Sequence, residues 1–67
     1  IMGTTFYYRS SCGEKSARFT TVSEATDWAI GLRMGELRAG INGCALLGYM
    51  DAMDGRWQLI AAWEECK

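Results

Sequence analysis

The sequence predicts an α+β domain with the element order ββαββ, in which one helix packs on one face of an antiparallel sheet. Three observations predict this fold. A capped helical segment lies in the middle of the chain, a segment rich in β-branched and aromatic residues precedes it, and two apolar runs joined by Asp54-Gly55 follow it. The chain of 67 residues has room for a single domain, and residues 1–3 are expected to be a tag-derived or disordered start.

The first two strands are expected to form a hairpin. Residues 4–9 are β-branched and aromatic residues followed by one arginine, a composition typical of a strand. Turn-forming residues occupy positions 10–16. In residues 17–20 apolar and polar side chains alternate, with Ala17 and Phe19 on one side, which predicts a short second strand.

The helix is predicted to run from Val22 to Ala39. Thr21 and Glu24 fit a capping box, in which both side chains accept hydrogen bonds from amides that the first turn leaves unpaired. Gly40 supplies the left-handed residue that commonly ends a helix. Gly31 and Gly35 lie about one turn apart inside the helix, and this spacing favours close packing against another element, with a kink as the alternative.

The last two strands are predicted from Cys44 to Asp51 and from Trp57 to Glu64. Asp54-Gly55 between them is typical of a two-residue type I′ turn, which places Met50 opposite Leu59. In this register one set of side chains is expected to lie under the helix. The set comprises Leu46, Met50, Leu59 and Trp63.

The other face of this hairpin is also apolar over its middle, whereas a sheet with one solvated face should alternate apolar and polar residues. One helix can cover only one face. We therefore expect a homodimer that buries the second face, because soluble monomers rarely expose large apolar patches. The residues predicted for self-association are Leu47, Tyr49, Ile60 and Ala62.

The helix likewise has two apolar stripes, although a surface helix normally has one. One stripe, which includes Trp28 and Leu32, is expected to meet the sheet. The opposite side is predicted to bind a protein partner. Its residues are Ile30, Arg33, Met34, Leu37 and Arg38. The alternative is a helix bent at its two glycines, with both stripes in one core and the N-terminal strands covering the second sheet face.

The residue types argue against catalysis. The chain has no His, so the commonest general base and metal ligand is missing. Its three cysteines, Cys12, Cys44 and Cys66, include no close pair, and we expect reduced thiols rather than a zinc site, with one intermolecular disulfide as the alternative. Asp51 and Asp54 flank the last turn and could be a carboxylate pair, but we expect Asp54 to be a turn residue and Asp51 to be a solvated strand end. The prediction is a protein that is not an enzyme and has no catalytic, cofactor or metal site.

A net charge of −1 argues against a basic nucleic-acid-binding protein, and the apolar run 59–63 is too short to cross a membrane. We expect a cytoplasmic protein, in the host cell if phage-encoded, that binds another protein as an inhibitor or adaptor. Phage or mobile-element accessory proteins that block host machinery such as a defence system are of this kind. The alternative is a small nucleic-acid-associated regulator that uses Tyr7, Arg9 and Arg18 of the first hairpin.

Overall fold

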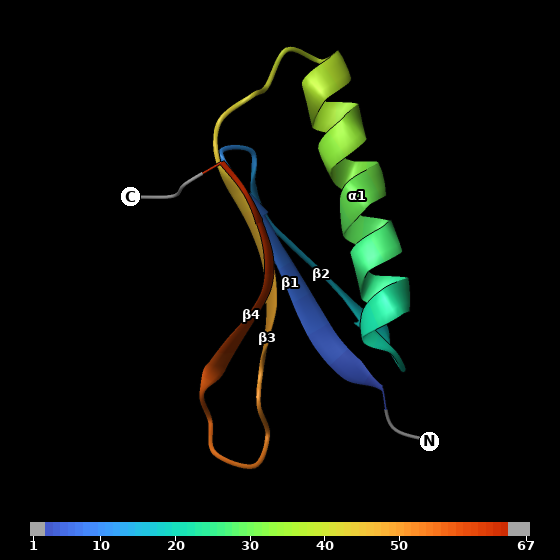
Figure 1. The fold of residues 1–67 in the computed structure, drawn as a ribbon, viewed down its shortest axis with the longest axis vertical. Helices are drawn as coiled ribbons and strands as arrows, with labels where there is room; N and C mark the ends of the chain where they lie inside the picture. The colour runs from blue at the N-terminus through green and yellow to red at the C-terminus, as the bar shows by residue number, and fades with distance from the viewer. Residues whose placement is uncertain (1–2, 65–67) are drawn as a thin grey trace.

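The computed structural model, which describes residues 3–64, contains a four-stranded antiparallel sheet with one helix across it (Figure 1). The sheet has the strand order β2-β1-β3-β4. The elements are β1 (Thr4–Ser10), β2 (Gly13–Phe19), α1 (Val22–Arg38), β3 (Ala45–Met50) and β4 (Trp57–Trp63). The predicted ββαββ fold is confirmed. Residues 1–3 were expected to be a tag-derived or disordered start, and residues 1–2 lie outside the described residues. The Gly3 carbonyl accepts a hydrogen bond from Arg18 (3.0 Å).

The first hairpin has a tighter turn than expected. β1 and β2 pair along their whole length, and only Ser11 and Cys12 lie between them. The second strand therefore begins at Gly13 rather than Ala17. The polar residues that resembled a loop belong instead to an exposed edge strand, where polar and charged side chains are common because they discourage pairing with other chains.

The helix begins and ends close to the predicted positions. The Thr21 hydroxyl accepts a hydrogen bond from the Glu24 backbone N–H (3.2 Å) and donates one to the Glu24 carboxylate (3.0 Å). Hydrogen bonds from the Thr20 and Thr21 hydroxyls lower the pKa of that carboxyl. Gly40 adopts a left-handed conformation (φ +81°) just after the helix. The cap and the terminating glycine are thus confirmed.

The close packing predicted at Gly31 and Gly35 is wrong. No heavy atom of a packed neighbour lies within 4 Å of the position that a Cβ would take at either residue. Both are exposed, and Figure 1 shows α1 as one continuous helix rather than a bent one. The two glycines lie on the side of the helix that faces away from the sheet.

The open space at these glycines gives a stability prediction. Gly31→Ala and Gly35→Ala should each raise the free energy of unfolding by about 0.5–1 kcal/mol, because alanine restricts the unfolded chain without a clash in the helix. Thermal melts would measure the gain. Gly40→Ala is the control and should destabilise, since its φ of +81° is unfavourable for alanine. A lower melting temperature for Gly31→Ala would contradict the prediction.

The core lies between α1 and the two central strands. Its buried residues are Phe6, Tyr8, Ala25, Ala29, Ala45 and Leu47. The two helical alanines face the sheet, and their small side chains allow the helix to approach it closely. Trp28 and Leu32 pack at the margin of this core, as predicted for the inner stripe. The Trp28 ring lies 5.4 Å from that of Phe19, between ring centroids.

The predicted register of the last hairpin is wrong. Met50 lies opposite Trp57 instead of Leu59. The loop contains residues 52–55, closed by a hydrogen bond from the Gly55 N–H to the Asp51 carbonyl (2.7 Å). The Asp51 carboxylate also accepts a hydrogen bond from the Met53 N–H (2.8 Å), and Gly55 has a φ of +69°. These interactions stabilise a four-residue loop in place of the two-residue turn.

Three of the four residues predicted for self-association lie on the helix side of the sheet. Leu47 is fully buried, and Tyr49 and Ile60 pack against the core. Leu47 and Tyr49 face the helix because they pair with the core residues Tyr8 and Phe6 of β1. Only Ala62 lies on the uncovered face, where it is exposed. The placement of the other three on the uncovered face is therefore wrong.

Three of the four hairpin residues predicted to lie under the helix lie on the opposite face of the sheet. Leu46, Met50 and Leu59 lie on the uncovered face, since Leu46 alternates with the buried Leu47 and a bulge between β3 and β4 brings Leu59 opposite Gly48. Trp63 is the exception. Its ring packs edge-on against that of Tyr8, with the centroids 5.9 Å apart.

Candidate functional site

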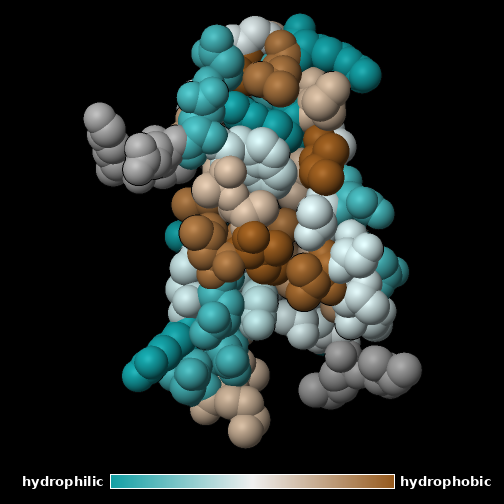
Figure 2. Space-filling view, in the orientation of Figure 1, coloured by the Kyte–Doolittle hydropathy of each residue, from teal (hydrophilic) through white to brown (hydrophobic). Residues whose placement is uncertain are grey.

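The sheet face opposite α1 carries an apolar surface on β3 and β4, which we call the open-face patch. It consists of Leu46, Gly48, Met50, Trp57, Leu59 and Ala62. The side chains of Met50 and Leu59 are 50% and 58% exposed. Figure 2 shows the molecule with the sheet nearly edge-on and β4 towards the viewer. Apolar side chains run across the middle of this view, from β4 to α1. Apolar surface therefore remains uncovered around β4.

The indole of Trp57 fills the space above Gly48. A Cβ at Gly48 would lie 2.7 Å from Cε2 of Trp57 and 2.6 Å from the carbonyl oxygen of Gln58, too close for any other residue without a shift. The Tyr7 ring centroid is 6.2 Å from that of Trp57, and the Arg9 guanidinium carbon is 4.8 Å from the indole centroid. The close approach explains why glycine occupies the middle of a central strand.

The adjoining half of this face, on β1 and β2, is polar. Arg9 forms an ion pair with Glu14, and Arg18 donates its hydrogen bond to the Gly3 carbonyl. Tyr7, Arg9 and Arg18, the residues considered for nucleic-acid binding, do share one sheet face. Both arginines already have a partner within the chain.

The outer side of α1 carries a second apolar surface, which we call the outer helix strip. Ile30, Met34 and Leu37 form it and are 44%, 47% and 45% exposed. Arg38 is exposed at the end of the helix, next to the strip. Four of the five residues predicted for partner binding therefore lie outward. Arg33 does not, since it is only 5% exposed.

Arg33 belongs to a buried polar cluster between α1 and β1. Its guanidinium lies 3.5 Å from the carboxylate of Glu36, which is itself 6% exposed. The same carboxylate accepts hydrogen bonds from the hydroxyls of Tyr8 (2.7 Å) and Ser10 (2.6 Å). Within residues 3–64, no buried side-chain nitrogen or oxygen lacks a hydrogen-bond partner. The cluster thus connects the second half of the helix to the strand beneath it.

The protonation states in this cluster follow from its contacts. Burial and the hydrogen bond to Glu36 raise the pKa of Tyr8 to about 12. Burial alone would raise the pKa of Glu36, but hydrogen bonds from Ser10, Tyr8 and Arg33 outweigh it and lower that pKa. At neutral pH the phenol is protonated and the carboxylate is ionised. Both groups are buried and paired, so their role is to hold α1 on the sheet.

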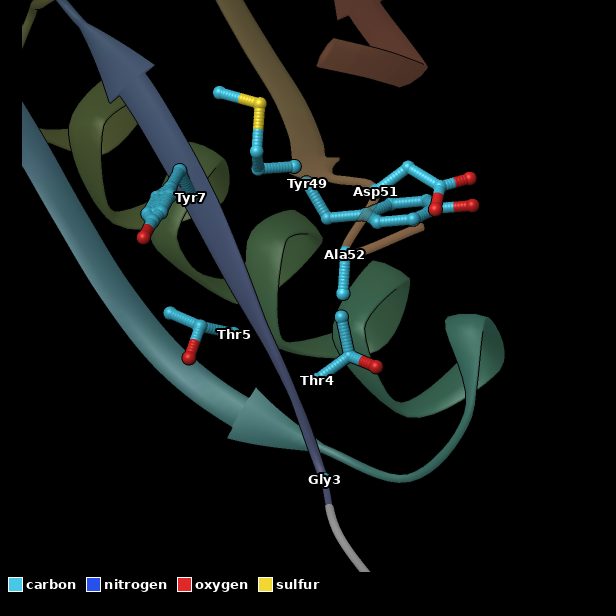
Figure 3. Close-up of a pocket in the computed structure, with 8 residues that line it drawn as sticks. Gly3, Thr4, Thr5, Tyr7, Tyr49, Asp51 and Ala52 are labelled. Carbon is cyan, nitrogen blue, oxygen red and sulfur yellow. The ribbon is translucent and has the colours of Figure 1, made fainter. Parts of the chain in front are cut away.

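A cleft of about 470 Å³ opens where β1 and β3 cease to pair, beyond Phe6 and Tyr49 (Figure 3). Thr4, Thr5, Tyr7 and Tyr49 are among the residues that line it. The one charged residue that lines the cleft is Asp51, whose carboxylate accepts a hydrogen bond from the Met53 N–H of the β3–β4 loop. In the part of the chain that the structure describes, no three His, Cys, Asp or Glu residues could together hold a metal ion.

The cysteines differ from the expectation of three reduced thiols. Cys44 is disulfide-bonded, whereas Cys12 is a free, exposed thiol in the first turn. Cys66 lies outside the described residues. No helix among residues 3–64 is long and apolar enough to span a membrane.

Comparison with known proteins gives no relative. No protein-family model matches the chain, and neither a curated protein nor a solved structure matches it. The two apolar surfaces and the polar groups beside them are therefore the features that bear on function.

Proposed function

We propose that the protein is a small non-catalytic binding protein, of inhibitor or adaptor type, that recognises a protein partner through the outer helix strip. The carrying observation is that Ile30, Met34 and Leu37 are each about half exposed on one side of α1. Their spacing of four and three residues is the one by which an amphipathic helix docks into an apolar groove of a partner. The opposite side of α1 is already occupied by the sheet.

The surroundings of the strip support a protein partner. Met34 at its centre is unbranched and adapts its shape to the surface it meets. Arg38 can pair with an acidic group at the rim, and Arg and Met are enriched in interfaces. Gly31 lies about one turn from Met34 and contacts no packed neighbour, so it leaves room for another backbone to approach closely.

The biological setting belongs to the same proposal. A phage or mobile-element accessory protein that blocks host machinery, such as a defence system, needs no active site if it covers a surface of its target. The absence of His from the chain is compatible with such a role. Action in the cytoplasm, of the host cell if the protein is phage-encoded, stays a prediction.

Met34→Glu tests the outer helix strip. The variant should keep its fold, with a change in unfolding free energy within about 0.5 kcal/mol, because a substitution on the surface is usually tolerated. It should lose the partner, because a carboxylate would be buried in an apolar interface. Circular-dichroism melts would measure folding, and capture from a lysate of the source cells with mass spectrometry would measure binding.

Met53→Glu is the matched control, since Met53 is 94% exposed in the β3–β4 loop, away from the strip. The control should retain every partner that the wild type captures. Retention of those partners by Met34→Glu would contradict the proposal. Loss of folding in Met34→Glu would also contradict it, because it would place Met34 in the core.

A nucleic-acid-associated regulator is the second candidate, and one observation favours it. Tyr7 and Trp57 lie side by side on the uncovered face with Arg9 over the indole, and aromatic side chains on such a face can stack bases. Titration of tryptophan fluorescence with a single-stranded oligonucleotide would test it. Binding that weakens steeply with added salt would support this candidate, because phosphate contacts are salt-dependent.

A further inference from the structure

We infer that the open-face patch binds a second copy of this chain, with the two sheets packed face to face in a homodimer. The inference goes beyond the proposed function, because α1 lies on the other side of each sheet and takes no part. Both outer helix strips would then point outward from the dimer and remain available to a partner. The surface is the one left uncovered once Leu47, Tyr49 and Ile60 are under the helix.

The charge of the open-face patch indicates which kind of molecule can bind there. The open-face patch contains no charged residue, and Arg9, the arginine beside it, forms an ion pair with Glu14. A polyanion or a strongly charged protein would gain little here. A twofold interface brings a surface against itself, so a neutral patch avoids like-charge contacts. The net charge of −1 adds little repulsion between copies.

The shape of the patch also suits a second sheet. Because Gly48 has no side chain, the indole of Trp57 lies against the backbone of β3 instead of standing away from it. The patch is therefore low and broad at its centre. Sheets that pack face to face interdigitate their side chains at a separation of roughly 10 Å, which favours such surfaces. Met50 and Leu59, each at least half exposed, are the side chains with most area to bury.

The size of the patch indicates a dimer of modest affinity. A standard interface buries about 800 Å² on each partner, roughly a sixth of the 4686 Å² that this chain exposes. Two strands form a surface roughly 20 Å long and 10 Å wide, which is smaller than such an interface. We therefore expect Tyr7 of the neighbouring strand to take part and the dimer to be weak, with much of the protein dissociated at low-micromolar concentration.

Sedimentation equilibrium from low-micromolar to near-millimolar concentration tests the inference. All proteins should carry Cys12→Ser, because the exposed thiol of Cys12 could cross-link two copies artificially. The parent is expected to rise from 7.5 kDa towards twice that mass. Leu59→Lys and Met50→Lys should each weaken the dimer at least about ten-fold, since a buried lysine would face the same patch of the other copy. Circular dichroism would confirm that both variants are folded.

Met34→Lys is the matched control on the other apolar surface and should dimerise like the parent. A parent mass of 7.5 kDa at every concentration would overturn the inference. Dimerisation of both Leu59→Lys and Met50→Lys with the affinity of the parent would also overturn the inference. Dissociation by Met34→Lys alone would place the second copy on α1 and would overturn it as well. The capture experiment with Met34→Glu is independent of these outcomes, so failure of one proposal is distinguishable from failure of the other.

Discussion

Glu36→Ala is expected to destabilise the protein by about 3–5 kcal/mol, because it leaves the buried guanidinium of Arg33 without a counter-charge. The substitution also removes the acceptor for the hydroxyls of Tyr8 and Ser10. The core of so short a chain supplies only about 3–5 kcal/mol in total. The variant should therefore be far less stable than the wild type and unfold at a much lower urea concentration.

Urea denaturation followed by circular dichroism would measure this loss. Glu14→Ala is the control, because it removes an exposed carboxylate paired with Arg9 and should cost no more than about 1 kcal/mol. Glu36→Gln should fall between the two, since an amide still accepts hydrogen bonds but carries no charge for Arg33. A Glu36→Ala variant within about 1 kcal/mol of the wild type would show that the cluster does not hold the helix.

The pH dependence of stability follows from the same contacts. Folding lowers the pKa of Glu36 below its ordinary value of 4.5, so the stabilisation is complete above that value and is lost as the pH falls through the folded-state pKa. Folding raises the pKa of Tyr8 from 10.0 to about 12, so its contribution is complete below pH 10.0 and is lost as the pH rises towards 12. Glu36→Gln should accordingly weaken the acid dependence.

The position of Glu36 was visible in the sequence, but its burial was not. Glu36 follows Leu32 by four residues and Ala29 by seven, which places it on the inner stripe of the helix. A carboxylate is almost never buried without partners, so its residue type argues for exposure even at an inner position. The partners that permit burial, Tyr8 and Ser10, are 28 and 26 residues away, and nothing local in the sequence pairs them with Glu36.

Features that depend on neighbouring residues were predicted well. The cap at Thr21, the end of the helix before Gly40 and the outward position of Met34 each follow from spacing within one or two turns. The register of the last hairpin was predicted wrongly, because the Asp51 carboxylate stabilises a four-residue loop around the same Asp-Gly pair. Both faces of that hairpin are apolar, so hydrophobicity alone could not show which one meets the helix.

Gly48→Ala is expected to destabilise the protein by about 1–3 kcal/mol, the usual cost of overpacking a close-packed site. At an ordinary strand position this change should stabilise instead, since glycine weakens a strand. Here the new Cβ would lie 2.6 Å from the Gln58 carbonyl oxygen, and backbone cannot move aside as a flexible side chain can. It would also push the Trp57 indole off the strand.

Gly43→Ala is the matched control, because its Cβ would meet nothing closer than 3.5 Å, an ordinary contact, and its stability should equal or slightly exceed that of the wild type. Thermal melts would measure both variants, and tryptophan fluorescence would report the displaced indole. Trp57→Ala combined with Gly48→Ala should recover only part of the loss, since the contact with the Gln58 carbonyl remains. Equal or greater stability of Gly48→Ala would mean that the strand yields easily at this point. The flat patch inferred to receive a second copy would then not depend on glycine.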